Sequence, residues 1–111
     1  MAGIAKRISK FTKREIDNLF KQSRRVLRNA LCTILIAPRQ VDFGRALIVT
    51  SRKVGNAPER NLIRRRIKSI FYEEKLYDRT VDCVIIAQKK INELSFDQLK
   101  ELILGVYAKI S

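Results

Sequence analysis

Hydrophobic residues recur at helical spacing in three stretches of this chain, and each stretch opens with the residues of a capping box. Thr12 with Glu15 is expected to start a first helix that runs to about Gln22. Ser95 with Gln98 is expected to start the last one. Each pair satisfies backbone N–H groups that the first turn of a helix leaves without partners, so the pattern predicts well-defined helix starts.

Four shorter stretches are apolar over the length of a β-strand. They span residues 24–28, 31–37, 45–52 and 81–87. The first three follow one another closely and are expected to pair antiparallel, whereas the fourth is almost continuously apolar, which indicates an interior strand covered on both faces. The order α-β-β-β-α-β-α predicts an α+β fold, a two-layer sandwich in which helices pack on a four-stranded sheet.

The chain has the length of a single domain, residues 1–111, and 46% of its residues are hydrophobic, so it is expected to fold around one core. Residues 1–10 are basic and weakly patterned, which predicts a flexible arm. No apolar run approaches the roughly 20 residues that span a bilayer, and the N-terminus lacks the apolar segment of a signal peptide. We therefore expect a cytoplasmic protein that has no membrane partner.

The charge balance changes the picture from a generic α+β domain to a binding protein for a polyanion. The chain has 24 basic and 11 acidic residues and a net charge of +13. A small domain with this excess repels itself unless a polyanion is present, which favours nucleic acid as the partner. Histidine, the commonest general base, is absent. Without it Cys32 and Cys83, which lie in apolar runs, are expected to be reduced core residues rather than zinc ligands.

The most basic stretch, residues 52–68, contains the middle helix, with seven lysines and arginines against one acid. Asn56 and Glu59 form its capping box, so the helix is expected to start at about Ala57 and to end near Lys75. Its buried stripe is expected to hold Ile63, Ile67, Ile70 and Phe71. The opposite side gathers Asn61, Arg64, Arg65, Lys68 and Tyr72.

A solvated helix face is the simplest interpretation of such a charge run. On a solvated face acids usually alternate with the bases, but here they are missing until Glu73 and Glu74. Like charges four residues apart destabilise a helix, so this arrangement becomes favourable only beside an anionic partner. A phosphate backbone meets that requirement, because arginine binds phosphate with two parallel hydrogen bonds.

The stretch reads Lys53-Val54-Gly55-Asn56-Ala57 and, after two residues, Arg60-Asn61-Leu62-Ile63-Arg64-Arg65-Arg66-Ile67-Lys68. It resembles the characteristic helix of the bacterial ribonuclease P protein family, which carries Arg-Asn-Arg and then a basic, isoleucine-spaced continuation. Arg60 and Asn61 match that pattern, and Leu62 departs from it at the second arginine. The resemblance covers nearly the whole chain and implies a left-handed β-α-β crossover, as in a domain of a small-subunit ribosomal protein.

The resemblance also implies a function. In this family the protein is the subunit of a ribonucleoprotein endonuclease that removes the 5′ leader of precursor tRNA. The catalytic RNA subunit carries most of the chemistry with Mg²⁺, bound mainly by the RNA and the substrate, so the protein alone is not expected to be active. The implied partners are the RNA subunit and the leader, and no stable protein partner is expected.

Site residues follow from the resemblance position by position. The residues implied to bind the RNA subunit are Arg52, Lys53, Arg60, Asn61, Arg64, Arg65, Arg66 and Lys68. Those implied to line a leader-binding cleft are Ile16, Phe20, Cys32 and Ile34. Core packing is the alternative role for Cys32 and Ile34, as packing on the sheet is for Ile16 and Phe20. No residue is expected to bind metal directly, although Asn61 is expected to lie near a metal site.

Two other functions remain open on sequence alone. A structural RNA-binding protein of the ribosome would have the same charge, size and fold class. A protein-only nuclease would need carboxylates such as Glu15, Asp17, Asp82 or Asp97 to hold a metal, but these acids lie at capping positions or alone and lack paired spacing.

Overall fold

The computed structural model describes residues 2–110 as a four-stranded sheet with helices on both faces, which confirms the α+β class. The helices are α1 (Ala2–Arg7), α2 (Lys13–Gln22), α3 (Ala57–Glu73) and α4 (Phe96–Ile110), and the strands are β1 (Arg24–Arg28), β2 (Cys32–Pro38), β3 (Ala46–Val49) and β4 (Val81–Ala87). Short 3₁₀ helices lie at Arg52–Val54 (η1), Leu76–Asp78 (η2) and Lys89–Glu93 (η3). In this range no helix is long and apolar enough to cross a membrane.

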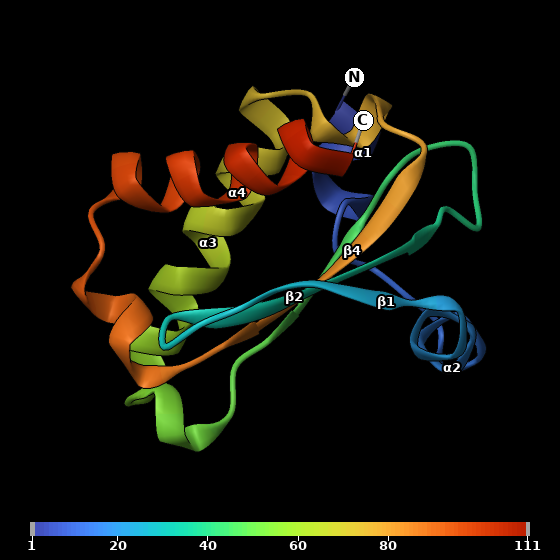
Figure 1. Ribbon diagram of the computed structural model, residues 1–111. Coiled ribbons are helices and arrows are strands. Elements are labelled where there is room, and N and C mark those ends of the chain that lie inside the picture. The colour runs from blue at the N-terminus through green and yellow to red at the C-terminus, as the bar shows by residue number, and fades with distance from the viewer. Residues whose placement is uncertain (1, 111) are drawn as a thin grey trace.

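The sheet has the strand order β1-β2-β4-β3. β1 and β4 both pair antiparallel with β2, and β3 pairs parallel with β4. The interior position expected for β4 is therefore confirmed, but the expected pairing of β2 with β3 is wrong because β4 lies between them. The left-handed crossover stays a prediction. Figure 1 shows α3 and α4 together on one side of the strands and α2 on the other.

The main core lies between one face of the sheet and the helices α1, α3 and α4. Both cysteines are free thiols inside it and are 0% exposed, which confirms their expected place. Burial raises the pKa of Cys32 to about 11 and that of Cys83 to about 12, because a thiolate would lose its hydration there. Neither thiol is available as a nucleophile or a metal ligand.

The N-terminal segment is part of this core rather than a flexible arm. Residues 2–7 form α1, and Ile8 is only 1% exposed. The Ile8 carbonyl accepts a 2.8 Å hydrogen bond from the Ala46 N–H, and the Arg7 guanidinium lies 4.9 Å from the centre of the Phe43 ring. The prediction is wrong because Ile8, directly after α1, is buried in the main core and Ile4 packs against that core.

On the opposite face of the sheet, α2 covers only one end. Leu19 is 1% exposed and packs with Ala37 and Val84. The two-layer description therefore holds for the main core, and α2 adds a partial third layer. The part of this sheet face that α2 leaves uncovered belongs to the candidate functional site.

A buried arginine fastens α2 to the sheet. Arg45 is 4% exposed and donates to the Lys10 carbonyl at 2.8 Å and to the two Glu15 carboxylate oxygens at 3.1 and 3.2 Å. The backbone N–H of Arg45 donates to Asp82 Oδ1 at 2.9 Å, and the Arg45 guanidinium lies 4.1 Å from the centre of the Phe11 ring. The hydrogen bond from Arg45 holds the pKa of Glu15 below its usual range, whereas burial raises the pKa of Asp82.

Candidate nucleic-acid interface

Helix α3 begins where the sequence predicts, because its capping box forms. Asn56 Oδ1 accepts the Glu59 N–H and Glu59 Oε1 accepts the Asn56 N–H, each at 2.9 Å. Gly55 makes this possible, since a Cβ at that position would lie 2.6 Å from Glu59 Oε1. The cap fixes the direction of the helix and therefore of every side chain on it.

The basic side of α3 faces solvent. The isoleucines at 63, 67 and 70 are at most 1% exposed and face the core. The opposite side carries the basic ridge, which we define as Asn61, Arg64, Arg65 and Lys68. With Pro58 these residues line a shallow surface hollow, so the structure brings the predicted polar face together.

The cations of the ridge have no carboxylate partners. Within residues 2–110, the ion pairs involve only Arg45 and Lys100 as cations. The one side-chain hydrogen bond within the ridge runs from Arg64 to Asn61 Oδ1 at 3.5 Å. The surface thus offers guanidinium and ammonium donors to an anionic ligand, and phosphate oxygens match such donors.

Two of the other predicted RNA-binding residues are differently placed. Arg66 lies outside the ridge, because its guanidinium donates to the Leu94 carbonyl at 3.2 Å and so ties α3 to the segment before α4. Arg60 is half-buried in the first turns of α3. For both, a contact with RNA stays a prediction.

Arg52 and Lys53 are exposed in η1, directly before α3. The 3₁₀ turn is held to η3, since Asn92 Nδ2 donates to the Val54 carbonyl at 2.7 Å. The two bases therefore extend the positive surface around the N-terminal end of the helix. Their contact with RNA also stays a prediction.

The predicted cleft residues separate into two groups. Phe20 is 44% exposed on α2, with Ile16 half-exposed one turn before it. Cys32 and Ile34 are 0% and 1% exposed in the main core beneath α3 and α4, so the prediction that they line a cleft is wrong. Successive residues of a strand face opposite sides of the sheet, and these two have the phase of the covered side.

The uncovered side of the sheet carries the alternate residues. We define the open sheet face as Thr33, Leu35, Leu47, Val49 and Ile86, all of which are half-exposed. Thr33 pairs with Ile86, and Ile86 pairs with Val49, so these three form one row across the sheet. Because β3 leads through η1 into α3, the row ends near Arg52 and the start of α3. The face thus joins the region of α2 to the basic end of α3.

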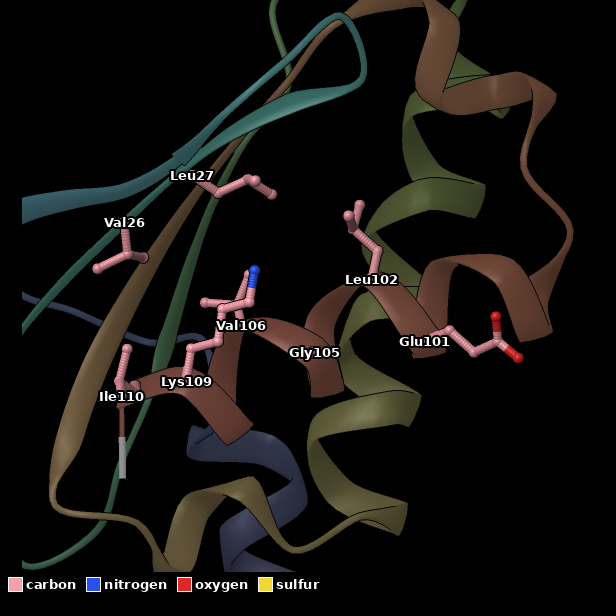
Figure 2. Close-up of a pocket in the computed structure, with 8 residues that line it drawn as sticks. All are labelled: Val26, Leu27, Glu101, Leu102, Gly105, Val106, Lys109 and Ile110. Atoms are coloured by element: carbon pink, nitrogen blue, oxygen red, sulfur yellow. The ribbon is translucent and has the colours of Figure 1, made fainter.

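Another surface hollow, of about 240 Å³, lies between β1 and α4 and is lined by Val26 and Leu27 with Leu102 and Val106, as Figure 2 shows. The charged residues at this hollow, Glu101 and Lys109, have opposite signs. Its floor is aliphatic. Within residues 2–110, no three His, Cys, Asp or Glu side chains are grouped to hold a metal ion.

Comparisons with known proteins lead to one family. The family model described as "Ribonuclease P" matches residues 6–111. The chain is similar to the ribonuclease P protein component of Petrotoga mobilis, with 31% identity over 88% of this chain and 86% of that protein. The corresponding component of Bacillus velezensis is 36% identical over 67% of this chain and 63% of its own length.

Two solved structures have the same fold. The ribonuclease P protein of Thermotoga maritima matches with a TM-score of 0.76 and 27% identity, over 93% of this chain and 97% of that one. The Staphylococcus aureus protein matches with a TM-score of 0.78 over 94% and 95% of the two chains, and at 21% identity it supports the fold alone.

Proposed function

The chain belongs to the ribonuclease P protein family, and we propose that its basic ridge docks on the catalytic RNA subunit while its open sheet face binds the 5′ leader of precursor tRNA. As a member of that family it is the protein subunit of a ribonucleoprotein endoribonuclease that processes tRNA. The two surfaces are proposed to divide the labour between assembly and substrate binding.

The observation that supports the docking surface is the set of exposed cations without carboxylate partners on α3. Each phosphate that such a surface neutralises releases counterions, so binding becomes strongly salt-dependent. Contacts to phosphates fix the position of a partner without reading its sequence. The ridge therefore suits a docking role on a folded RNA.

The open sheet face supports the second half of the proposal. A single-stranded leader presents unstacked bases, which bind to apolar and aromatic surface while cations hold the backbone. Phe20 is exposed on α2, whose Leu19 packs on this side of the sheet, and Arg52 follows β3 in η1. A leader that crosses from one to the other would find base contacts first and phosphate contacts at the end.

We propose that the protein does not itself hold the magnesium ion. The basic ridge offers one acceptor side chain, Asn61, among donors, and Mg²⁺ prefers several oxygen ligands. We propose that phosphates of the RNA subunit and substrate hold the Mg²⁺ that assists hydrolysis. This chain then contributes by binding and positioning those strands, with Asn61 near the metal as a prediction.

The two alternative functions have less support. The comparisons name ribonuclease P proteins, and nothing in them favours a ribosomal protein. For a protein-only nuclease, Glu15 and Asp82 would have to bind metal, but both are hydrogen-bonded to Arg45. Asp17 and Asp97 belong to different helices, α2 and α4.

Replacing Phe20 with alanine is expected to weaken binding of precursor tRNA by about 5- to 150-fold when the leader is long, because stacking of one base contributes about 1–3 kcal/mol. Mature tRNA, which has no leader, should bind almost unchanged. The measurement is the dissociation constant of each substrate for the holoenzyme reconstituted with the RNA subunit.

Phe20→Tyr is the matched control, since it keeps an aromatic ring and should keep the preference for long leaders. Equal loss with precursor and mature tRNA would contradict the proposed leader contact and would leave Phe20 a packing role. In a separate cleavage assay, the protein without the RNA subunit should leave the precursor uncut.

A further inference from the structure

One exposed aromatic side chain extends the basic ridge. Phe20, Leu62 and Tyr72 are the large apolar residues exposed within the described chain, and Tyr72 is 41% exposed. It follows Lys68 by four residues and Arg65 by seven on α3, so it continues the same side of the helix. The positive surface therefore ends in an aromatic ring.

The ring of Tyr72 is supported from within the protein. Tyr77 in η2 stacks on it, with the ring centres 6.1 Å apart and the planes 29° apart. Lys75 adopts a left-handed conformation, with φ of 53°, that turns the chain back after α3. The Tyr77 carbonyl accepts a 2.7 Å hydrogen bond from the Gly44 N–H, which holds η2 in place. A ligand would thus meet an aromatic surface that is already ordered.

The charges around this ring suit a nucleotide. Lys68 lies one turn before Tyr72 on the same side, and Lys75 is exposed just after the helix. Glu74 is drawn away into an ion pair with Lys100 of α4, at 3.6 Å. Glu73 is one position further around the helix, about 100° from Tyr72. Phosphates on either side of a stacked base would have cations within reach.

We propose that Tyr72 is a stacking platform for an unpaired RNA nucleobase at the end of the basic ridge. The proposal rests on the proposed function, because it takes the ridge as an RNA-docking surface. An unpaired base is the fitting ligand, since bases inside a duplex are already stacked, whereas looped or terminal bases are free to stack on aromatic side chains. The base could come from the RNA subunit or from the precursor tRNA.

Two substitutions separate stacking from simple bulk. Tyr72→Phe is expected to bind like the unchanged protein, whereas Tyr72→Leu keeps apolar bulk but removes the ring and is expected to weaken binding by about 5- to 150-fold. The slope of affinity against salt should stay the same in both, because no charge is lost. The measurement is the dissociation constant across salt concentrations, with folding checked by circular dichroism.

The source of the base is read from two titrations. Loss of affinity for the RNA subunit alone would place the base in that RNA, and loss only when precursor tRNA binds the holoenzyme would place it in the substrate. Either loss supports the proposal. Unchanged affinity of Tyr72→Leu in both titrations would overturn it. The proposed function would survive that result if Arg64→Ala with Arg65→Ala still weakened binding, and would fail with it if it did not.

A fluorescence measurement tests the same contact directly. The sequence contains no tryptophan, so Tyr72→Trp supplies a single indole, which can be excited selectively over the remaining tyrosines. Stacking of a base on the indole should quench its emission when the RNA subunit or the precursor is added. Emission that stays constant through saturation with both RNAs would contradict the stacking contact.

Discussion

Arg45→Ala is expected to lower the free energy of unfolding by about 3–5 kcal/mol, because removing one partner of a buried charge network leaves the others without compensation. The substitution removes the donors to Glu15 and to the Lys10 carbonyl and leaves Asp82 buried beside an empty volume. Since the same guanidinium fastens α2 to the sheet, leader binding should weaken too. Chemical denaturation measures the change in stability.

Asp82→Asn is the matched control for this prediction. An asparagine keeps the Oδ1 acceptor for the Arg45 N–H, so the loss of stability should be much smaller. Burial raises the pKa of Asp82 above its usual 3.8, so this carboxyl makes the unchanged protein less stable as pH rises through the raised pKa. The asparagine variant should therefore gain stability relative to it as pH rises above 3.8. A loss of less than 1 kcal/mol for Arg45→Ala would contradict the account of the network.

Replacing Arg64 and Arg65 together with alanine is expected to weaken binding of the RNA subunit about 100-fold at low salt. Two hydrogen bonds from charged donors contribute about 1.5 kcal/mol each at the low end of their range. The slope of log affinity against log salt should fall by roughly 1.4–1.8, since each phosphate contact adds about 0.7–0.9. The fold should stay intact because both side chains lie on the solvent side of α3.

The control for this pair is Arg28→Ala with Lys109→Ala, which removes the same charge from exposed positions on β1 and α4. If net charge alone determined binding, the two double variants would have equal affinity for the RNA subunit. If they reduce affinity and salt slope by the same amount, docking is diffuse and the basic ridge has no special role.

Helix starts could be predicted from sequence because capping is local chemistry. The boxes at Thr12, Asn56 and Ser95 all form, with both reciprocal hydrogen bonds in each. The ridge follows from the same locality, since a capped helix fixes which side chains share a side. Helix α3 ends at Glu73, close to the expected end near Lys75, but no residue pattern indicated the left-handed conformation of Lys75.

Features that depend on long-range contacts could not be predicted in the same way. In β2, both alternating sets of side chains are apolar enough to be buried, so the sequence does not say which set faces α3 and α4. The resemblance placed Cys32 and Ile34 in the cleft, but the structure gives them the alternative role, core packing, and Leu35 has the phase of the open sheet face. The Arg45 network joins residues up to 37 positions apart, and β3 pairs with β4 only after the whole of α3.

The most direct test of the docking surface is cleavage of the RNA by a tethered reagent. Both native cysteines are 0% exposed, so a thiol reagent should label only the cysteine introduced by Lys68→Cys. The reagent carries an iron chelate that generates hydroxyl radicals, which cut RNA strands close to the labelled position. The account predicts strand cuts in the RNA subunit, clustered at one place, from Lys68→Cys and few or none from Lys109→Cys beside the hollow between β1 and α4. Cuts from Lys109→Cys with none from Lys68→Cys would contradict it.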